Sequence, residues 1–284
     1  MSGEHYVISL SSAVERRQHI RNQFSQKNIP FQFFDAISPS PLLDQLVLQF
    51  FPRLADSSLT GGEKACFMSH LSLWHKCVEE NLPYIVVFED DIVLGKDADK
   101  FLIGDEWLFS RFDPEEIFII RLETFLQKVV CESTHIAPYT HRDFLSLKSA
   151  HFGTAGYVIS QGAAKFLLDI FKNISNEHIA PIDELIFNQF LVKNSFNVYQ
   201  LSPAICVQEL QLNNESSALQ SQLELERNKF RNKKSEELKR NRKNFIEKFI
   251  YILKKPKRKT IKTLHYKKED ITSRFFLHEA VSQA

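Results

Sequence analysis

The stretch YIVVFEDDIVL, residues 84–94, carries a run of apolar side chains directly into three consecutive carboxylates. Residues 84–88 are all aliphatic or aromatic, a pattern typical of a central strand that is covered on both faces. Glu89, Asp90 and Asp91 follow at the carboxyl end of that strand, and open α/β sheets bind their ligands beyond such ends. The stretch therefore predicts an α/β fold with an acidic site at the tip of a buried strand.

The three acids have two interpretations. Alternation along an extended backbone places Glu89 and Asp91 on one side and Asp90 on the other. Carboxylates held that close repel each other unless a cation lies between them, and hard oxygen ligands select Mg²⁺ or Mn²⁺, which keep open positions for phosphate oxygens. The alternative is a solvated turn or the N-cap of the next helix. The apolar residues on both sides of the triplet, 84–88 and 92–94, favour the metal site.

The sequence around this strand predicts alternating strands and helices. Residues 5–10, HYVISL, and 31–37, FQFFDAI, are predicted strands, and the helix between them has capping-box spacing at Ser12 and Glu15. A β-α-β opening of this kind indicates a sheet with crossover helices. Further predicted elements are a helix at 59–81 that begins with a Thr60–Glu63 capping box, a strand at 115–123, a strand at 152–160 followed by a helix at 161–171, a helix at 179–191, and a strand pair or bent strand at 196–208.

The composition is that of an ordinary globular protein. The chain has 284 residues, of which 43% are hydrophobic and 25% charged, enough for one large α/β domain with an appendage or for two small domains. The first ten residues contain neither a basic segment nor a long apolar run, so we expect no signal peptide, no membrane span and a cytoplasmic location. The four cysteines lack the C-x-x-C spacing of zinc sites and redox pairs, and we expect reduced thiols.

Positive charge is concentrated near the C-terminus. Residues 227–268 hold eighteen of the 36 Lys and Arg but only three of the 35 Asp and Glu, although the formal net charge of the chain is +1. Leu238, Phe245, Phe249 and Ile252 fall on one face of a predicted helix surrounded by basic residues, which is typical of an interfacial helix attracted to anionic lipid. Two alternatives are an electrostatic arm for nucleic acid and a helix packed on the rest of the protein. The apolar stripe favours a membrane surface, and no nucleic-acid partner is expected.

Five motifs follow one another along the chain: YVISLSSAVERRQHI (6–20), LTGGEKACFMSHLSLW (59–74), VVFEDDIVL (86–94), GTAGYVISQGAAKFL (153–167) and PIDELIF (181–187). Their order and gaps resemble the bacterial lipooligosaccharide glycosyltransferases of family 25, which also includes the collagen galactosyltransferases. The resemblance covers roughly residues 5–210. It implies a GT-A-like, Rossmann-type sheet flanked by helices that binds a UDP-sugar, with a catalytic domain at 1–212 and a helical, basic, membrane-associating region at 213–284.

The resemblance also implies a divalent metal, Mn²⁺ or Mg²⁺, held against the sugar diphosphate by an acidic motif. The family's usual Asp-x-Asp is Glu-Asp-Asp here, and we expect Asp91 first and Glu89 second as metal ligands, with Asp90 facing the nucleotide. Transfer with inversion needs a base for the acceptor hydroxyl. The expected base is Asp183, with Glu184 as the alternative, although both acids equally suit the N-terminus of a helix.

Further residues are expected around the sugar donor. Glu63, Ser69 and His70 match the family pattern GE..C..SH, and Glu63 and His70 share a neighbouring face of the predicted helix. The plainer interpretation is a packed, structural histidine. The remaining expected donor-site residues are Arg16 for phosphate, Gly153, Thr154 and Gly156 for close backbone approach to a sugar, and Gln208 at the end of the late strand.

The resulting hypothesis is a metal-assisted transfer, with inversion, of a hexose from a UDP-sugar to a lipooligosaccharide or LPS core acceptor. Galactose is the favoured hexose, and the expected location is peripheral, on the cytoplasmic face of the bacterial inner membrane. The alternatives are UDP-glucose as the donor, or a protein that binds glycans or nucleic acid without turnover. The intact carboxylate triplet favours an enzyme.

Overall fold

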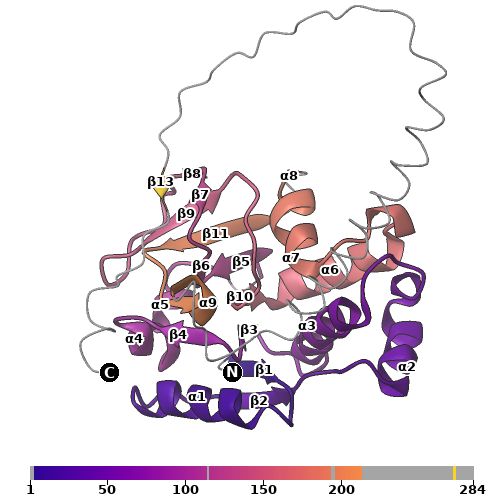
Figure 1. The fold of residues 1–284 in the computed structure, drawn as a ribbon. Coiled ribbons are helices and arrows are strands. Elements are labelled where there is room, and N and C mark those ends of the chain that lie inside the picture. Colours follow the sequence, from indigo (N-terminus) through magenta and orange to yellow (C-terminus); the bar gives the residue numbers. More distant parts are fainter. Residues whose placement is uncertain (1–2, 114, 193–195, 213–270, 273–284) are drawn as a thin grey trace, which may run out of the picture. The chain divides into compact units, whose positions relative to one another are not determined.

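The computed structural model describes residues 3–113, 115–192, 196–212 and 271–272, which form a mixed α/β unit around one large sheet (Figure 1). Eight of the described strands pair in the order β2-β1-β3-β10-β5-β11-β9-β8. These strands are β1 (Glu4–Ser9), β2 (Gln32–Asp35), β3 (Tyr84–Glu89), β5 (Phe118–Arg121), β8 (Cys131–Glu132), β9 (Asp143–Leu147), β10 (Gly156–Ser160) and β11 (Asn197–Ser202).

Strand direction brings several strand ends to one edge of this sheet. β1 pairs in parallel with β2 and β3, and β10 pairs antiparallel with both β3 and β5. β3 and β5 therefore run the same way, and their carboxyl ends lie at the same edge as the start of β10, where Gly156 pairs with Phe88. Parallel neighbours need crossover connections, which are supplied by α1 (Val14–Ser25) between β1 and β2, and by α2 (Pro41–Phe50) and α3 (Gly61–Glu79) between β2 and β3.

A second, three-stranded sheet begins where the long strands end. Its order is β4-β12-β6, formed by β4 (Ile92–Leu94), β12 (Cys206–Gln208) and β6 (Glu123–Thr124). β4 follows β3 after a two-residue turn, and β6 follows β5 after one residue. Gln208 of β12 pairs with Ile92. This small sheet therefore extends from the acidic edge of the large one.

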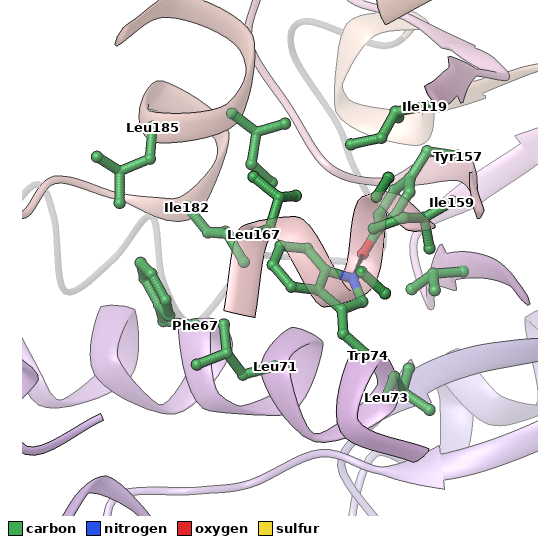
Figure 2. Packing of buried hydrophobic residues seen from close by; sticks show 14 of the residues in the cluster. Phe67, Leu71, Leu73, Trp74, Ile119, Tyr157, Ile159, Leu167, Ile182 and Leu185 are labelled. Atoms are coloured by element: carbon green, nitrogen blue, oxygen red, sulfur yellow. Dashed lines mark hydrogen bonds between the residues drawn. The ribbon is translucent and has the colours of Figure 1, made fainter. Parts of the chain in front are cut away.

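Helices cover both faces of the large sheet because its strand residues alternate between two apolar cores. Ile85 and Val87 belong to the core beneath α3 and α6 (Gln161–Asn173), whereas Val86 and Phe88 belong to the core beneath α1. Figure 2 shows the first core, where Trp74 of α3 lies among residues from other elements. Those neighbours include Leu167 of α6, Tyr157 and Ile159 of β10, and Ile182.

The predicted strands and helices are confirmed over most of the described chain. Thr60 and Glu63 form both hydrogen bonds of the capping box that begins α3. The predicted capping box at Ser12 is wrong, because α1 begins at Val14 with Ala13 as N-cap and no side-chain cap. The segment at 179–191 is helical in three pieces: α7 (Ile182–Glu184), a π-helical turn η3 (Leu185–Gln189) and α8 (Phe190–Val192).

Other described elements were not predicted. α2 lies in a segment punctuated by prolines, where Pro41 occupies the first helical turn and so costs no hydrogen bond. The remaining elements are η1 (Pro52–Leu54), α4 (Ala98–Leu102), α5 (Glu106–Phe109), β7 (Lys128–Val129), η2 (Asn176–His178), α9 (Glu209–Leu212) and β13 (Ile271–Thr272), which pairs with β7. The predicted basic helix within 227–268, and the region 213–284 apart from 271–272, lie outside the described residues.

Candidate active site

The carboxylate triplet lies at the turn between β3 and β4, and the turn is buried. Glu89 is the last residue of β3, and Asp90 and Asp91 form the two-residue turn before β4. Asp90 is 6% exposed and Asp91 is 8% exposed. The solvated surface turn that the sequence left open is therefore excluded, because both charged side chains are largely removed from water.

Asp90 is neutralised within the protein. Its Oδ2 accepts a hydrogen bond of 2.6 Å from the Ser9 hydroxyl at the end of β1, and its Oδ1 accepts one of 2.5 Å from Nη1 of Arg16 in α1. The same guanidinium lies 3.8 Å from Asp91. Arg16 was expected to meet phosphate, and the structure places it on the acidic turn, where it offsets part of the turn's negative charge.

Asp91 has weaker partners than Asp90. Nε2 of Gln208 lies 3.4 Å from each of its carboxylate oxygens, and the Glu209 amide donates to its backbone carbonyl at 2.8 Å. Burial, together with the neighbouring negative charge of Glu89, raises the pKa of Asp91 to about 7. An ionised Asp91 is therefore costly here unless positive charge is added beside it.

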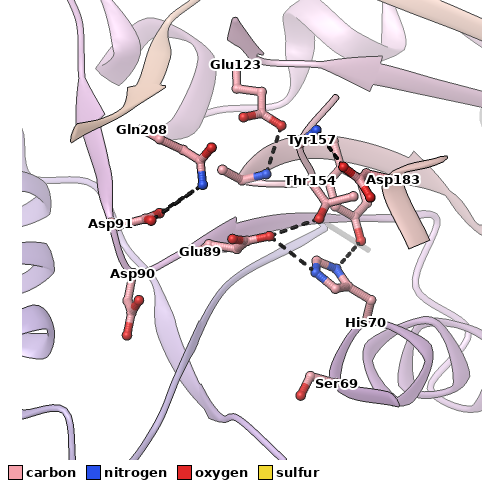
Figure 3. A network of polar contacts seen from close by, with 12 residues as sticks. Ser69, His70, Glu89, Asp90, Asp91, Glu123, Thr154, Tyr157, Asp183 and Gln208 are labelled. Carbon is pink, nitrogen blue, oxygen red and sulfur yellow. Dashed lines mark hydrogen bonds and ion pairs between the residues drawn. The ribbon is translucent and has the colours of Figure 1, made fainter. Parts of the chain in front are cut away.

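Glu89 is held in the ionised form by neighbours from two elements. Burial alone would raise its pKa, but contacts from His70, the Thr154 hydroxyl and the charge of Arg16 together lower it. Thr154 donates a hydrogen bond of 2.9 Å to Oε1, and Nε2 of His70 lies 3.6 Å from the same oxygen (Figure 3). The structure thus brings together Glu89, His70 and Thr154, which were predicted from separate motifs.

The ring of His70 is fixed from its other side. His70 is fully buried in α3, and its Nδ1 shares a hydrogen bond of 2.8 Å with the Tyr157 hydroxyl, which also accepts one of 3.0 Å from the Trp74 indole. Sequence reasoning expected Glu63 to orient this histidine. Glu63 instead closes the capping box with Thr60 at the start of α3, so Tyr157, which the sequence did not single out, is the residue that holds the ring.

A second buried acid, Glu123, was missed by the sequence analysis. It is 1% exposed, its Oε1 accepts a hydrogen bond of 2.8 Å from the Ala155 amide, and Oε2 has no hydrogen-bond partner among the described residues. Burial raises its pKa to about 8, with Glu89 and Asp91 adding to the effect and Arg121 opposing it. The signal was an Arg and a Glu two residues apart in an otherwise apolar strand sequence, IIRLE (119–123).

Arg121 organises the loop before β10. Its buried guanidinium donates to the carbonyls of Phe152 at 2.6 Å and Gly153 at 2.8 Å, and lies 3.4 Å from Glu123. Gly153 has φ of +84°, and a Cβ there would lie 3.0 Å from the Glu123 carboxylate. Glycine is therefore required at this position for the close approach of the loop to an acid, rather than for an approach to a sugar alone.

Asp183 lies beside this loop and Glu184 points to its own helix. The Gly153 amide donates to Oδ2 of Asp183 at 3.1 Å, and the Gly153 carbonyl accepts from Arg121, which lies 3.4 Å from Glu123. Glu184 accepts a hydrogen bond of 2.5 Å from Asn188, four residues further along the same helical segment. Of the two expected bases, Asp183 is the one that the described contacts connect to the other acids.

Two further expected donor-site residues have structural partners. The Ser69 hydroxyl accepts from the Ile37 amide and donates to the Ala65 carbonyl, both at 2.9 Å, and in Figure 3 it points away from the acids. Gly156 begins β10 where a Cβ would lie 2.5 Å from the Cys206 sulfur. These contacts explain both residues through packing, since neither reaches the carboxylates in the described part of the chain.

The chain is an α/β protein with a cluster of buried charged residues at the carboxyl ends of its strands, where open α/β sheets bind their ligands. The family model described as glycosyltransferase family 25 (LPS biosynthesis protein) matches residues 3–186. The chain therefore belongs to glycosyltransferase family 25, as the five sequence motifs predicted.

Several relatives are similar over most of their length. Lipooligosaccharide biosynthesis protein lic2B of Haemophilus influenzae is 51% identical over 225 residues, which cover 79% of this chain and 83% of that protein. Lipooligosaccharide biosynthesis protein lex-1 of the same species is 46% identical, covering 80% and 83%. The lacto-N-neotetraose biosynthesis glycosyltransferase LgtB of Neisseria meningitidis is 47% identical, covering 79% and 83%.

Proposed function

We propose that this protein transfers a hexose from a UDP-sugar to a lipooligosaccharide acceptor. Family membership supports glycosyl transfer, and the names of lic2B and lex-1 support lipooligosaccharide as the product. The observation that carries the proposal is the buried group of acids at the strand ends, in which Asp91 and Glu123 have raised pKa values next to an ionised Glu89. Carboxylates whose charge is not compensated favour the binding of a cation. The bound cation can in turn bind an anionic ligand.

A divalent cation, Mn²⁺ or Mg²⁺, fits these residues. Hard carboxylate oxygens are the ligands that both ions prefer, and the charge of Asp91 is incompletely compensated, with Gln208 no closer than 3.4 Å and Arg16 3.8 Å away. Asp91 and Glu89 would hold the ion. Asp90 is already bonded to Ser9 and Arg16. When bound, such an ion would neutralise charge on the diphosphate leaving group.

Asp183 is proposed as the base. One of its oxygens is fixed by the Gly153 amide, and the side chain is half-buried, so the other oxygen can meet an acceptor hydroxyl. A carboxylate in hydrogen-bond reach of that hydroxyl takes its proton as the new glycosidic bond forms. Direct displacement of the diphosphate by the hydroxyl inverts the configuration at the anomeric carbon.

An exposed aromatic ring adjoins this acid. Phe152 is 43% exposed, although its backbone carbonyl is held by Arg121, and its ring contacts Phe125 edge-on at 6.1 Å between centroids. A rigid backbone with an exposed ring offers an apolar face to a sugar. We therefore include Phe152 in the proposed acceptor site, immediately before Gly153 and Thr154.

The finer parts of the proposal concern the donor and the location. The family resemblance favours galactose as the transferred hexose, with glucose as the alternative. Within the described residues, no helix is long and apolar enough to cross a membrane. Contact with an anionic membrane surface through residues 227–268, on the inner face of the bacterial inner membrane, rests on the charge of that segment.

The test is transfer by the purified full-length protein. UDP-galactose, UDP-glucose and UDP-N-acetylglucosamine are each supplied with Mn²⁺ and a truncated lipooligosaccharide, and the product is identified by mass spectrometry. We expect one added hexose from UDP-galactose, no product in EDTA, and no product from the Asp91→Asn variant. Full transfer by Asp91→Asn, or binding of glycan without turnover of any donor, would overturn the proposal.

A further inference from the structure

A thiol, an imidazole and a carboxylate meet on the α3 side of Glu89. Cys66 and His70 are four residues apart in α3, so their side chains share one face of the helix. Cys66 Sγ, a ring nitrogen of His70 and a carboxylate oxygen of Glu89 all lie within 4.8 Å of one another. On sequence, Cys66 was expected to be a reduced thiol and His70 a donor-site residue, and the proposed reaction uses neither as a metal ligand.

The contact between His70 and Glu89 has the spacing of two ligands rather than that of a hydrogen bond. Nε2 of His70 lies 3.6 Å from Oε1 of Glu89, is buried, and has no hydrogen-bond partner among the described residues. Hydrogen bonds between N–H and O are about 2.7–3.2 Å long. Tetrahedral zinc with bonds of about 2.0–2.3 Å to N, O and S separates its ligand atoms by about 3.4–3.6 Å.

We propose that Cys66, His70 and Glu89 form a binding site for a thiophilic divalent cation such as Zn²⁺, next to the hard-oxygen site at Asp91 and sharing Glu89 with it. Thiolate and imidazole ligands select zinc over Mn²⁺ and Mg²⁺. Three protein ligands leave a fourth position open, as in zinc sites that exchange a ligand. The Glu89 side chain is 23% exposed and Cys66 is half-buried, so an ion can enter from solvent.

The surroundings of His70 suit metal binding. A histidine that binds metal through one nitrogen usually donates its other N–H to an outer partner, which orients the ring. That partner is the Tyr157 hydroxyl, 2.8 Å from Nδ1. The hydroxyl has two lone pairs, so it can accept from His70 and from the Trp74 indole, 3.0 Å away, at the same time. With a metal bound, Nε2 would offer its lone pair to the ion.

The site shares Glu89 with the proposed catalytic metal site, and this has a regulatory consequence that rests on the proposed function. An ion bound by Cys66 and His70 draws the Glu89 carboxylate toward α3 and away from Asp91. Zinc is therefore expected to inhibit transfer in the presence of saturating Mn²⁺. Zinc binding itself does not depend on which sugar is transferred, or on any transfer.

Binding is tested first, on full-length protein stripped of metal and kept in buffer without Mn²⁺. Zn²⁺ is titrated by calorimetry, and Co²⁺ is used as a probe because a thiolate-to-cobalt absorption band reports sulfur ligation. Cys66→Ala should remove the band and weaken Zn²⁺ binding by more than about 100-fold, and Tyr157→Phe should weaken binding by about 10–100-fold, as loss of an outer partner does. Cys131→Ala, which removes a buried thiol outside the cluster, should bind as the wild type does.

Absence of Zn²⁺ binding by the wild type, or equal binding by Cys66→Ala and the wild type, would overturn the site. The regulatory consequence is tested separately: Cys66→Ala should keep the Mn²⁺-dependent rate and lose inhibition by Zn²⁺. If the wild type transfers no sugar but binds Zn²⁺ through Cys66, the proposed function fails and the zinc site stands. If it transfers sugar and binds no Zn²⁺, the zinc site fails and the proposed function stands.

Discussion

Replacing Asp91 with asparagine is expected to stabilise the metal-free protein while abolishing its activity. Burial and the charge of Glu89 raise the pKa of Asp91 from 3.8 to about 7. A raised folded-state pKa favours the protonated folded form, so this contribution to stability is fully present below pH 3.8 and is lost as the pH rises through about 7. Asparagine cannot ionise, so Asp91→Asn does not lose this contribution to stability as the pH rises.

The size of the effect follows from the pKa. One pH unit corresponds to about 1.4 kcal/mol, so moving the pKa of Asp91 to about 7 corresponds to at most about 4 kcal/mol once the side chain is ionised. Asparagine still bears part of the burial cost of a polar group, so we expect a gain on the order of 2–4 kcal/mol. In a protein of this size each kcal/mol changes the melting temperature by about 2–4 °C, which predicts a rise on the order of 4–16 °C.

The assay is thermal unfolding in EDTA, followed by circular dichroism at about pH 3.5 and about pH 8.5, which lie below the unfolded pKa of 3.8 and above the folded pKa of about 7. Asp91→Asn should unfold close to the wild type at the lower pH and well above it at the higher pH. Glu123 is present in both proteins, and loss of the Asp91 charge lowers its pKa, which changes the melting temperature in the same direction. A variant that is less stable than the wild type at the higher pH would refute the reasoning.

Replacement of the neighbouring residue, Asp90, is a control that should change the melting temperature in the opposite direction. Asp90 accepts hydrogen bonds from Ser9 and Arg16, so Asp90→Asn replaces the charged acceptor of the Arg16 guanidinium with a neutral amide. A hydrogen bond to a charged group contributes about 1.5–3 kcal/mol, and part of that is lost with the neutral amide. Asp90→Asn should therefore lower the melting temperature in the same buffers. Equal shifts for the two adjacent variants would show that the contacts described for the turn do not determine its energetics.

The remaining predictions concern catalysis. Asp183→Asn should lower kcat by about 10²–10⁴-fold with donor binding retained, whereas Glu184→Gln should leave kcat near the wild-type value. The reverse result in a transfer assay would identify Glu184 as the base. Phe152→Ala should raise the acceptor KM by about tenfold, the equivalent of one aromatic contact, with Phe152→Tyr near wild type; unchanged steady-state constants contradict a sugar platform. Truncation after residue 226 should preserve transfer to soluble acceptors and weaken transfer to vesicle-borne glycolipid, and a parallel fall in both activities and in melting temperature argues for a structural tail.

The main sheet was predictable from local patterns. The run at 84–88 is apolar because both faces of β3 are covered, and its alternate residues enter two different cores. The helix at Pro41 was missed because proline usually interrupts a helix, and only its position in the first turn makes it compatible with one. The π-helical turn at 185–189 has no sequence signature, since its hydrogen-bond spacing is set by packing.

The site was predictable in part, and the misses share one physical cause. Acids at a strand end are visible in a sequence, so Glu89 and Asp91 were found. Glu123 and Tyr157 become site residues only through tertiary pairing: Gly156 of β10 lies opposite Phe88, and Tyr157 lies opposite Arg121. This pairing places the Tyr157 hydroxyl on His70 and the Ala155 amide on Glu123. No spacing along the chain encodes contacts between strands that are antiparallel neighbours from distant segments.

The contacts around the acidic turn divide its charges into two kinds. The charge of Asp90 is compensated by Arg16 and Ser9, so that this acid helps to hold α1 against the ends of β1 and β3. Asp91 and Glu123 are buried with raised pKa values and incomplete compensation. A fold selected for stability alone would pair or remove such acids, because each uncompensated buried charge costs several kcal/mol, on the order of the whole free energy of unfolding. Buried acids of this kind are compatible with folding when a ligand supplies the missing positive charge. Binding of that ligand then offsets the free-energy cost of the buried acids and so stabilises the folded protein.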